Sequence, residues 1–108
     1  MSYLYIVSVF ETLGVTMELS NTVIMCNNDN QFKRLADWLH ERGYDVAMRD
    51  MVPTKEYANE TVKCSISTYK NKRTGWCKTS WYRDNPEYRG FKFIPFSQIV
   101  KPIKKVIL

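Results

Sequence analysis

The stretch that decides the fold is residues 28–43, which read NDNQFKRLADWLHERG. Four apolar side chains in it recur at the spacing of one helix face: Phe32, Leu35, Ala36 and Leu39. Charged side chains fall on the opposite face of the same stretch, so one side is apolar and the other polar. A helix of this kind must bury its apolar stripe against another element, which makes it the organising piece of a small domain.

Both ends of this helix carry boundary signals. Asn28 or Asn30 can cap its N-terminus, and Gln31 stands three residues after Asn28, as in a capping box. Gly43 suits the position after the C-terminus, because glycine enters the left-handed conformation without steric strain. We therefore predict one amphipathic helix over about residues 29–42.

Strand patterns precede the helix. Residues 3–10 (YLYIVSVF) are rich in β-branched and aromatic side chains, and residues 15–19 alternate apolar with polar side chains. Residues 23–26 form a short apolar run. Each of the three segments predicts a strand.

Further strand patterns follow the helix. The expected strands are residues 44–52, a hairpin over residues 61–83 and residues 90–96. Pro53 ends the first of them, because proline cannot donate to a ladder, and residues 54–60 fit a loop or one helical turn. Residues 71–75 (NKRTG) supply the hairpin turn. After Ser97 the chain fits a short helix or one more strand.

This order of elements predicts an α+β fold. We expect a mostly antiparallel sheet of about five to seven strands with one main helix packed on one face. A chain of 108 residues is a usual length for one core, and no Pro/Gly-rich linker divides it. Residues 1–108 are therefore expected to form a single domain.

The two halves of the chain differ in charge. Residues 1–54 hold seven acidic and four basic side chains, a net charge of −3, whereas residues 55–108 hold four acidic and twelve basic side chains, a net charge of +8. Such asymmetry favours an anionic partner, although a sheet can also mix the two halves in space.

The N-terminal stretch is not typical of an export signal. It lacks a basic start, Ser8 interrupts its apolar run, and Glu11 stands where small cleavage-site residues are expected. No run approaches the roughly 18 apolar residues of a membrane span. We expect a cytoplasmic protein with no membrane partner, in the host cell cytoplasm if the chain is viral.

Catalytic and metal patterns are weak. The cysteines (Cys26, Cys64 and Cys77) are odd in number and lack the C-x₂₋₄-C spacing of a zinc site. His40, the only histidine, falls at the end of the predicted helix, and no nucleophile, zincin, P-loop or dinucleotide motif is present. We expect free thiols, no metal, no cofactor, no small-molecule substrate and no enzymatic activity.

The candidate contact surface lies in residues 69–96, where aromatic and basic side chains interleave. The contact residues we select are Lys70, Lys72, Arg73, Trp76, Lys78, Trp81, Tyr82, Arg83, Arg89 and Lys92. Strand alternation over residues 76–82 would put Trp76 and Lys78 on one face and Trp81 on the other. The pattern fits an ordinary amphipathic sheet, a protein interface anchored by aromatic residues, or a surface that stacks bases and neutralises phosphates.

Two segments carry a resemblance to a class of proteins. Residues 32–46 (FKRLADWLHERGYDV) and residues 90–100 (GFKFIPFSQIV) resemble parts of small bacteriophage accessory proteins of α+β fold. The resemblance implies a host-takeover or anti-defence protein that binds a host macromolecule, often one that handles nucleic acid. No individual functional residue carries over from it.

Together these patterns favour a non-enzymatic inhibitor or regulator. The expected partner is a host protein that handles nucleic acid, bound through the basic, aromatic second half of the chain. The alternative is direct DNA or RNA binding by residues 61–96. The sequence leaves the partner's identity and the oligomeric state open.

Overall fold

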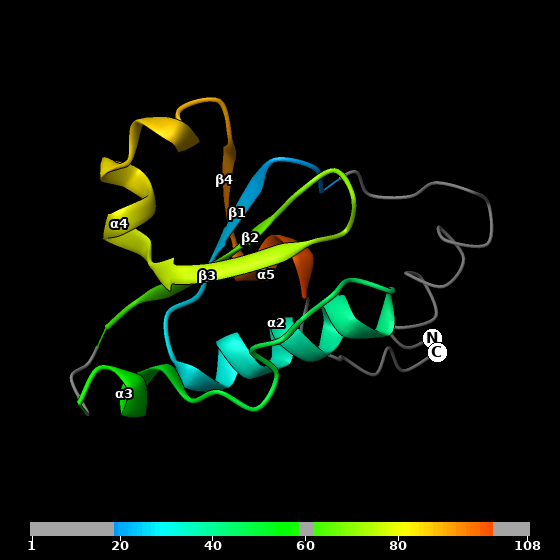
Figure 1. Cartoon of the computed structure of the whole chain (residues 1–108). Coiled ribbons are helices and arrows are strands. Elements are labelled where there is room, and N and C mark those ends of the chain that lie inside the picture. The colour runs from blue at the N-terminus through cyan, green and yellow to red at the C-terminus, as the bar shows by residue number, and fades with distance from the viewer. Residues whose placement is uncertain (1–18, 59–61, 101–108) are drawn as a thin grey trace, which may run out of the picture.

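A computed structural model describes residues 19–58 and 62–100 (Figure 1). The strands are β1 (Thr22–Met25), β2 (Cys64–Thr68), β3 (Thr74–Lys78) and β4 (Lys92–Pro95). The helices are α2 (Asp29–Glu41), α3 (Pro53–Glu56), α4 (Thr79–Asp84) and α5 (Phe96–Ile99), with a 3-10 turn η1 (Pro86–Tyr88). The part of the chain that the structure describes therefore has the predicted α+β class.

The described strands form one mixed sheet in the order β3-β2-β1-β4. β2 pairs antiparallel with both β1 and β3, whereas β4 pairs parallel with β1. In this register Ile24 lies beside Ile66 and Ile94, and Ile66 lies beside Trp76. These four side chains form an apolar row across the whole sheet, and helix α2 packs on it.

Helix α2 covers one face of the sheet as its apolar stripe predicts (Figure 1). The predicted stripe is buried in full: Phe32, Leu35, Ala36 and Leu39. Helix α5 joins this side through Phe96, whose ring lies 5.4 Å from the Arg34 guanidinium carbon. Helix α3 is tied to the start of α2, because the Thr54 backbone N–H donates to Asp29 Oδ1 at 3.1 Å.

The ends of α2 are set by the residues that the sequence indicates. Asn28 is the N-cap, and its Oδ1 accepts from the backbone N–H of Gln31 at 2.8 Å. Gln31 Oε1 accepts in return from the backbone N–H of Asn27 at 2.8 Å, one residue earlier than in a standard capping box. Gly43 has φ +85°, the left-handed conformation expected after the helix. The predicted helix is confirmed.

The opposite face of the sheet is covered by α4 (Figure 1). Ser65 and Ser67 point to this face from β2, opposite Cys77 and Gly75 of β3. Tyr82 of α4 is only 2% exposed and packs over them, with a hydrogen bond of 2.9 Å between its hydroxyl and Ser67 Oγ. The sheet is thus sandwiched between an apolar helical layer and a layer that meets it through hydroxyl groups.

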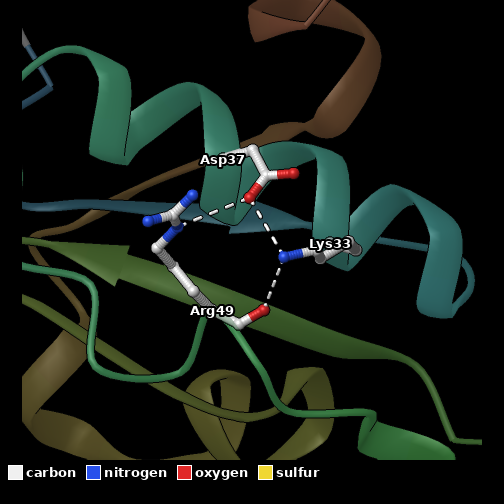
Figure 2. Close-up of polar contacts among 3 residues, drawn as sticks. All are labelled: Lys33, Asp37 and Arg49. Carbon is white, nitrogen blue, oxygen red and sulfur yellow. Dashed lines mark hydrogen bonds and ion pairs between the residues drawn. The ribbon is translucent and has the colours of Figure 1, made fainter.

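Residues 44–52 do not form the predicted strand. A single bridge joins Asp45 to Arg73, and turns follow at residues 47–50. Val46 and Met48 of this segment are buried in the core with the α2 side chains. Figure 2 shows its polar contacts with α2: Lys33 Nζ lies 3.1 Å from Asp37 Oδ1 and 2.9 Å from the Arg49 carbonyl oxygen, and Arg49 Nε lies 3.5 Å from the same Asp37 oxygen. These contacts hold the segment against α2 instead of along the sheet.

The structure confirms some of the other predicted strands and helices and corrects the rest. The 61–83 hairpin is present as β2 and β3, but its second strand ends at Lys78 and the chain turns into α4. The strands expected at 23–26 and 90–96 correspond to β1 and β4, and α3 is the helical turn expected within 54–60. The short helix expected near Ser97 is present as α5, whereas the alternative strand over residues 99–108 lies mostly outside the described residues. About five to seven strands and a single main helix are not confirmed, since the described residues contain four strands in a mixed sheet and four α-helices.

Some predictions fall outside the described residues. The strand predicted at 3–10 and residues 15–18 of the next lie there, as does the whole C-terminal stretch 101–108. Among residues 19–58 and 62–100, no helix is long and apolar enough to cross a membrane.

The α2 packing gives a direct test of the fold. Leu35→Ala or Leu39→Ala should lower the free energy of unfolding by about 2–5 kcal/mol, because each leaves a cavity beneath the sheet. Urea denaturation followed by circular dichroism measures the change. His40→Ala, on the exposed side of the same helix, should stay within about 0.5 kcal/mol of the parent. Equal losses in all three variants would contradict the packing.

Candidate functional site

The ten predicted contact residues fall in five places along the chain. Lys70, Lys72 and Arg73 lie in or beside the β2–β3 turn; Trp76 and Lys78 in β3; Trp81, Tyr82 and Arg83 in α4; Arg89 after η1; and Lys92 in β4. The structure does not bring all of them together. β4 and β3 are opposite edges of the sheet, so Lys92 is separated from the turn by about 14 Å, three strand spacings.

Trp76 belongs to the core rather than to a contact surface. Its ring meets Phe32 of α2 edge to face, with centroids 5.7 Å apart, and Tyr57 at 5.9 Å. The Lys78 ammonium lies 4.5 Å from the centroid of the same Tyr57 ring. Trp76 is therefore half-buried beneath Tyr57, and the role of partner anchor predicted for it is not supported by its position.

Tyr82 is a correction to the predicted surface. It was expected at the end of a strand and among the contact residues, but it lies in α4 and is only 2% exposed. A helix turns successive side chains by about 100° and not by about 180° as in a strand, so the alternation expected for residues 76–82 does not hold beyond Lys78. Its ring is part of the layer under α4 and is closed to a partner in this fold.

Trp81 is the aromatic residue that the structure leaves open. It is 46% exposed, and Val52 at 37% is the other exposed large apolar side chain of the described residues. The Trp81 ring rests on Tyr82 and Tyr88, with centroids 5.3 and 5.6 Å apart. The indole is thus backed by two aromatic rings on one side and open on the other.

Positive charge surrounds this part of the chain. Residues 62–83 contain six basic side chains and no acidic one. Arg83 touches Met25 Sδ through Nη2 at 3.3 Å, and Arg73 leaves the hairpin on the same face as its partner Tyr69. Arg89 follows η1 and is exposed.

The ion pairs of residues 19–58 and 62–100 lie elsewhere, on α2 and its C-cap: Lys33–Asp37, Arg49–Asp37 and Arg42–Glu41. No carboxylate in these ranges pairs with Arg73, Arg83 or Arg89, although Asp84 and Glu87 are exposed nearby in the chain. We call Trp81, Arg83 and Arg89 the α4 surface. Its cations are free to meet an anionic group.

Lys72 is exposed to solvent but makes contacts that have a structural role. Its backbone has φ +60°, its Nζ donates to the Arg42 carbonyl oxygen at 3.1 Å, and its own carbonyl accepts from the Asp45 N–H at 2.9 Å. The ammonium also lies 5.6 Å from the Tyr44 ring centroid. Lys72 therefore joins the turn to the end of α2, whereas Lys70 is exposed and makes no such contact.

Groups suited to catalysis or metal binding are not assembled in the described part of the chain. No cluster of three His, Cys, Asp or Glu side chains there could hold a metal ion. All three cysteines are free thiols, and burial raises the pKa of Cys26 to about 12 and that of Cys64 to about 11. Such thiols stay protonated and unreactive at neutral pH.

The sequence analysis missed a hydroxyl cluster beneath α4. Ser67 Oγ donates to Tyr69 Oη at 3.1 Å, and the hydroxyls of Tyr69 and Tyr88 are 2.8 Å apart. Small side chains at Ser67 and Gly75, opposite each other in the hairpin, were the available signal. They leave room for large side chains to pack on that face.

The role of Lys72 can be measured against that of Lys70. Lys72→Ala should lower the free energy of unfolding by about 0.5–1.5 kcal/mol, because it removes the hydrogen bond to Arg42. Lys70→Ala should leave stability within about 0.5 kcal/mol of the parent. Urea titration of both variants measures their free energies of unfolding. Equal values would show that the Lys72 contact does not stabilise the fold.

The raised thiol pKa values predict a loss of stability in alkali. Unfolding lets Cys26 and Cys64 ionise near the ordinary pKa of 9.0, whereas in the folded protein the pKa is about 12 for Cys26 and about 11 for Cys64. The unfolded state then binds fewer protons, so stability is full below pH 9 and falls as the pH rises toward 11. Denaturant titrations at several pH values measure this slope. Cys77→Ala should keep it, and the double variant Cys26→Ala/Cys64→Ala should reduce it; an unchanged slope would refute the assignment.

Comparison with known proteins adds no family assignment. Protein-family models, curated proteins and solved structures were each compared with the chain, and none of them matches.

Proposed function

We propose that this chain is a small non-enzymatic binding protein that docks on an acidic patch of a protein partner through the α4 surface. The observation that carries the proposal is Trp81, an exposed tryptophan on a rigid aromatic base. Tryptophan and arginine are the side chains most enriched among the residues that dominate protein interfaces. Arg83 and Arg89 stand near it in the chain without carboxylate partners among the described residues.

The arrangement of the other rings favours protein over nucleic acid. A surface that binds single strands offers several ring faces in succession, one for each stacked base. Here Tyr69, Tyr82, Tyr88 and Phe91 meet one another edge to face, with centroids 4.7–5.7 Å apart, and Tyr82 is buried. Only Trp81 among the rings of this cluster is classed as exposed, which suits a single anchor inserted into a partner's pocket.

Direct nucleic-acid binding is the second candidate, and one observation favours it. The six basic side chains of residues 62–83 stand without an acidic one, and such a run attracts phosphates. Two of these side chains, Lys72 and Lys78, are engaged with the Tyr44 and Tyr57 rings. The charge available for a phosphate backbone is therefore smaller than the sequence indicates.

The biological setting that we propose follows from the resemblance to bacteriophage accessory proteins. The chain would act in the host cytoplasm as an inhibitor or regulator, with an anti-defence role, and its partner would be a host protein that handles nucleic acid. On such a partner the basic surface would meet an acidic patch, because a phosphate-binding patch is itself basic and would repel it. Electrostatic steering would then speed the encounter, and Trp81 would slow dissociation.

Photo-crosslinking at the anchor tests the proposal. We expect p-benzoylphenylalanine in place of Trp81 to crosslink one protein in a nuclease-treated host extract, and the same residue in place of Val52 to leave that protein unlabelled. With the purified partner, Trp81→Ala should weaken the affinity by about 30-fold or more, because an interface tryptophan can contribute about 2 kcal/mol. Val52→Ala, a matched loss of exposed apolar surface, should bind like the parent.

Charge and salt separate the two candidates. Charge reversal at Arg83 and Arg89 should mainly slow association with the partner protein. Gel shifts with single- and double-stranded DNA and RNA at about 50 and 200 mM salt measure direct phosphate binding, which weakens steeply with salt. Full affinity of Trp81→Ala for the crosslinked protein would overturn the docking proposal, and strong salt-dependent shifts would establish the nucleic-acid alternative.

A further inference from the structure

A chain of hydroxyl groups runs beneath α4 from the sheet interior to the surface. It begins at Tyr82, whose hydroxyl lies 2.9 Å from Ser67 Oγ, continues from Ser67 to Tyr69 at 3.1 Å and ends with Tyr88 at 2.8 Å from Tyr69. Ser67 belongs to the central strand β2 and has no exposed surface. The hydroxyl chain is therefore attached through Ser67 to the buried central strand of the sheet.

Gly75 makes this hydroxyl chain possible. A Cβ atom at position 75 would lie 3.1 Å from Ser67 Oγ, 3.7 Å from Tyr69 Oη and 3.8 Å from Tyr82 Oη. A side chain there would crowd the three oxygens at the point where they meet. The absence of a side chain in β3 thus leaves the space that the tyrosine hydroxyls occupy.

The rings of the same tyrosines carry Trp81. Its indole contacts Tyr82 and Tyr88, and those two rings meet each other edge to face with centroids 4.8 Å apart. The hydroxyl of Tyr82 is bound to Ser67 directly, and that of Tyr88 is bound through Tyr69. Both supports of the exposed indole are therefore anchored at their far ends in β2.

We infer that the hydroxyl chain positions Trp81 for docking, so that Ser67, Tyr69, Tyr82 and Tyr88 act as positioning residues of the α4 surface. This inference rests on the proposed function, because it assumes that Trp81 meets the partner. Ring contacts alone allow a phenol to slide, since edge-to-face packing tolerates a range of offsets. A hydrogen bond at the hydroxyl end removes that freedom, and an indole that is already oriented loses less entropy on binding.

The protonation state supports this role. Burial raises the pKa of Tyr82 and of Tyr88 above the ordinary value of 10.0. Both phenols therefore stay protonated throughout the physiological pH range and keep their hydrogen bonds in the hydroxyl chain. The order of the cluster is expected to be independent of pH between 6 and 9.

Fluorine NMR on protein labelled with 5-fluorotryptophan tests the inference without a partner. The three tryptophans give three resonances, and Trp81→Phe identifies the one from Trp81. Tyr88→Phe and Ser67→Ala keep the rings but remove a hydroxyl, so the Trp81 resonance should narrow and move toward its value in unfolded protein. Tyr57→Phe is the matched control: its ring contacts Trp76, so the Trp76 resonance should move and that of Trp81 should not.

Affinity for the crosslinked partner gives the second readout. Tyr88→Phe should weaken binding about two- to tenfold, the range that one net hydrogen bond represents, while Tyr57→Phe binds like the parent. An unchanged Trp81 resonance in both hydroxyl variants would overturn the positioning role. Undiminished affinity of Trp81→Ala would instead overturn the docking function, so the two failures are read from different measurements.

Discussion

The structure depends on a central strand that is buried on both faces and yet is mostly polar. β2 reads CSIST, and all five of its residues are buried. A buried hydroxyl without a partner costs about 1–3 kcal/mol, so the three hydroxyls of this strand must each find one. Ser65 Oγ lies 2.7 Å from Thr79 Oγ1, Ser67 binds two tyrosines, and Thr68 Oγ1 donates to the Leu19 carbonyl. The choice of neighbours around β2 follows from this requirement.

The two faces of the sheet consequently differ in chemistry. On the α2 face the row Ile94–Ile24–Ile66–Trp76 meets apolar helix side chains, and the contact is stabilised by burial alone. On the other face Thr79 and Tyr82 must supply oxygen atoms, which places the start of α4 directly over β2. With Tyr82 turned inward to Ser67, the neighbouring Trp81 lies on the outer side of α4 and is 46% exposed.

The sequence predicts the elements whose signals are local, and fails where distant contacts decide. Helix α2 carries its stripe and both caps within residues 28–43, so it could be located before the structure was known. Val46 and Met48 alternate like strand residues, but the contacts of Lys33, Asp37 and Arg49 (Figure 2) fold that segment against α2. Trp81 and Tyr82 stand in a pattern that fits strand and short helix equally. The hydrogen bond from Tyr82 to Ser67, fifteen residues away, is what distinguishes them.

Charge in the sequence likewise says little about which cations are available. Lys33, Arg49 and Lys72 are all held by contacts with α2 or its C-cap, so they contribute to the packing of the turn and the 44–52 segment. Arg73, Arg83 and Arg89 have no carboxylate partner in the described residues, and Arg83 lies in α4 while Arg89 follows η1. Among the described residues, the cations on α2 are therefore compensated, whereas Arg83 and Arg89 are not. Under the docking function proposed above, these two arginines would steer the approach of an acidic partner before short-range contacts form.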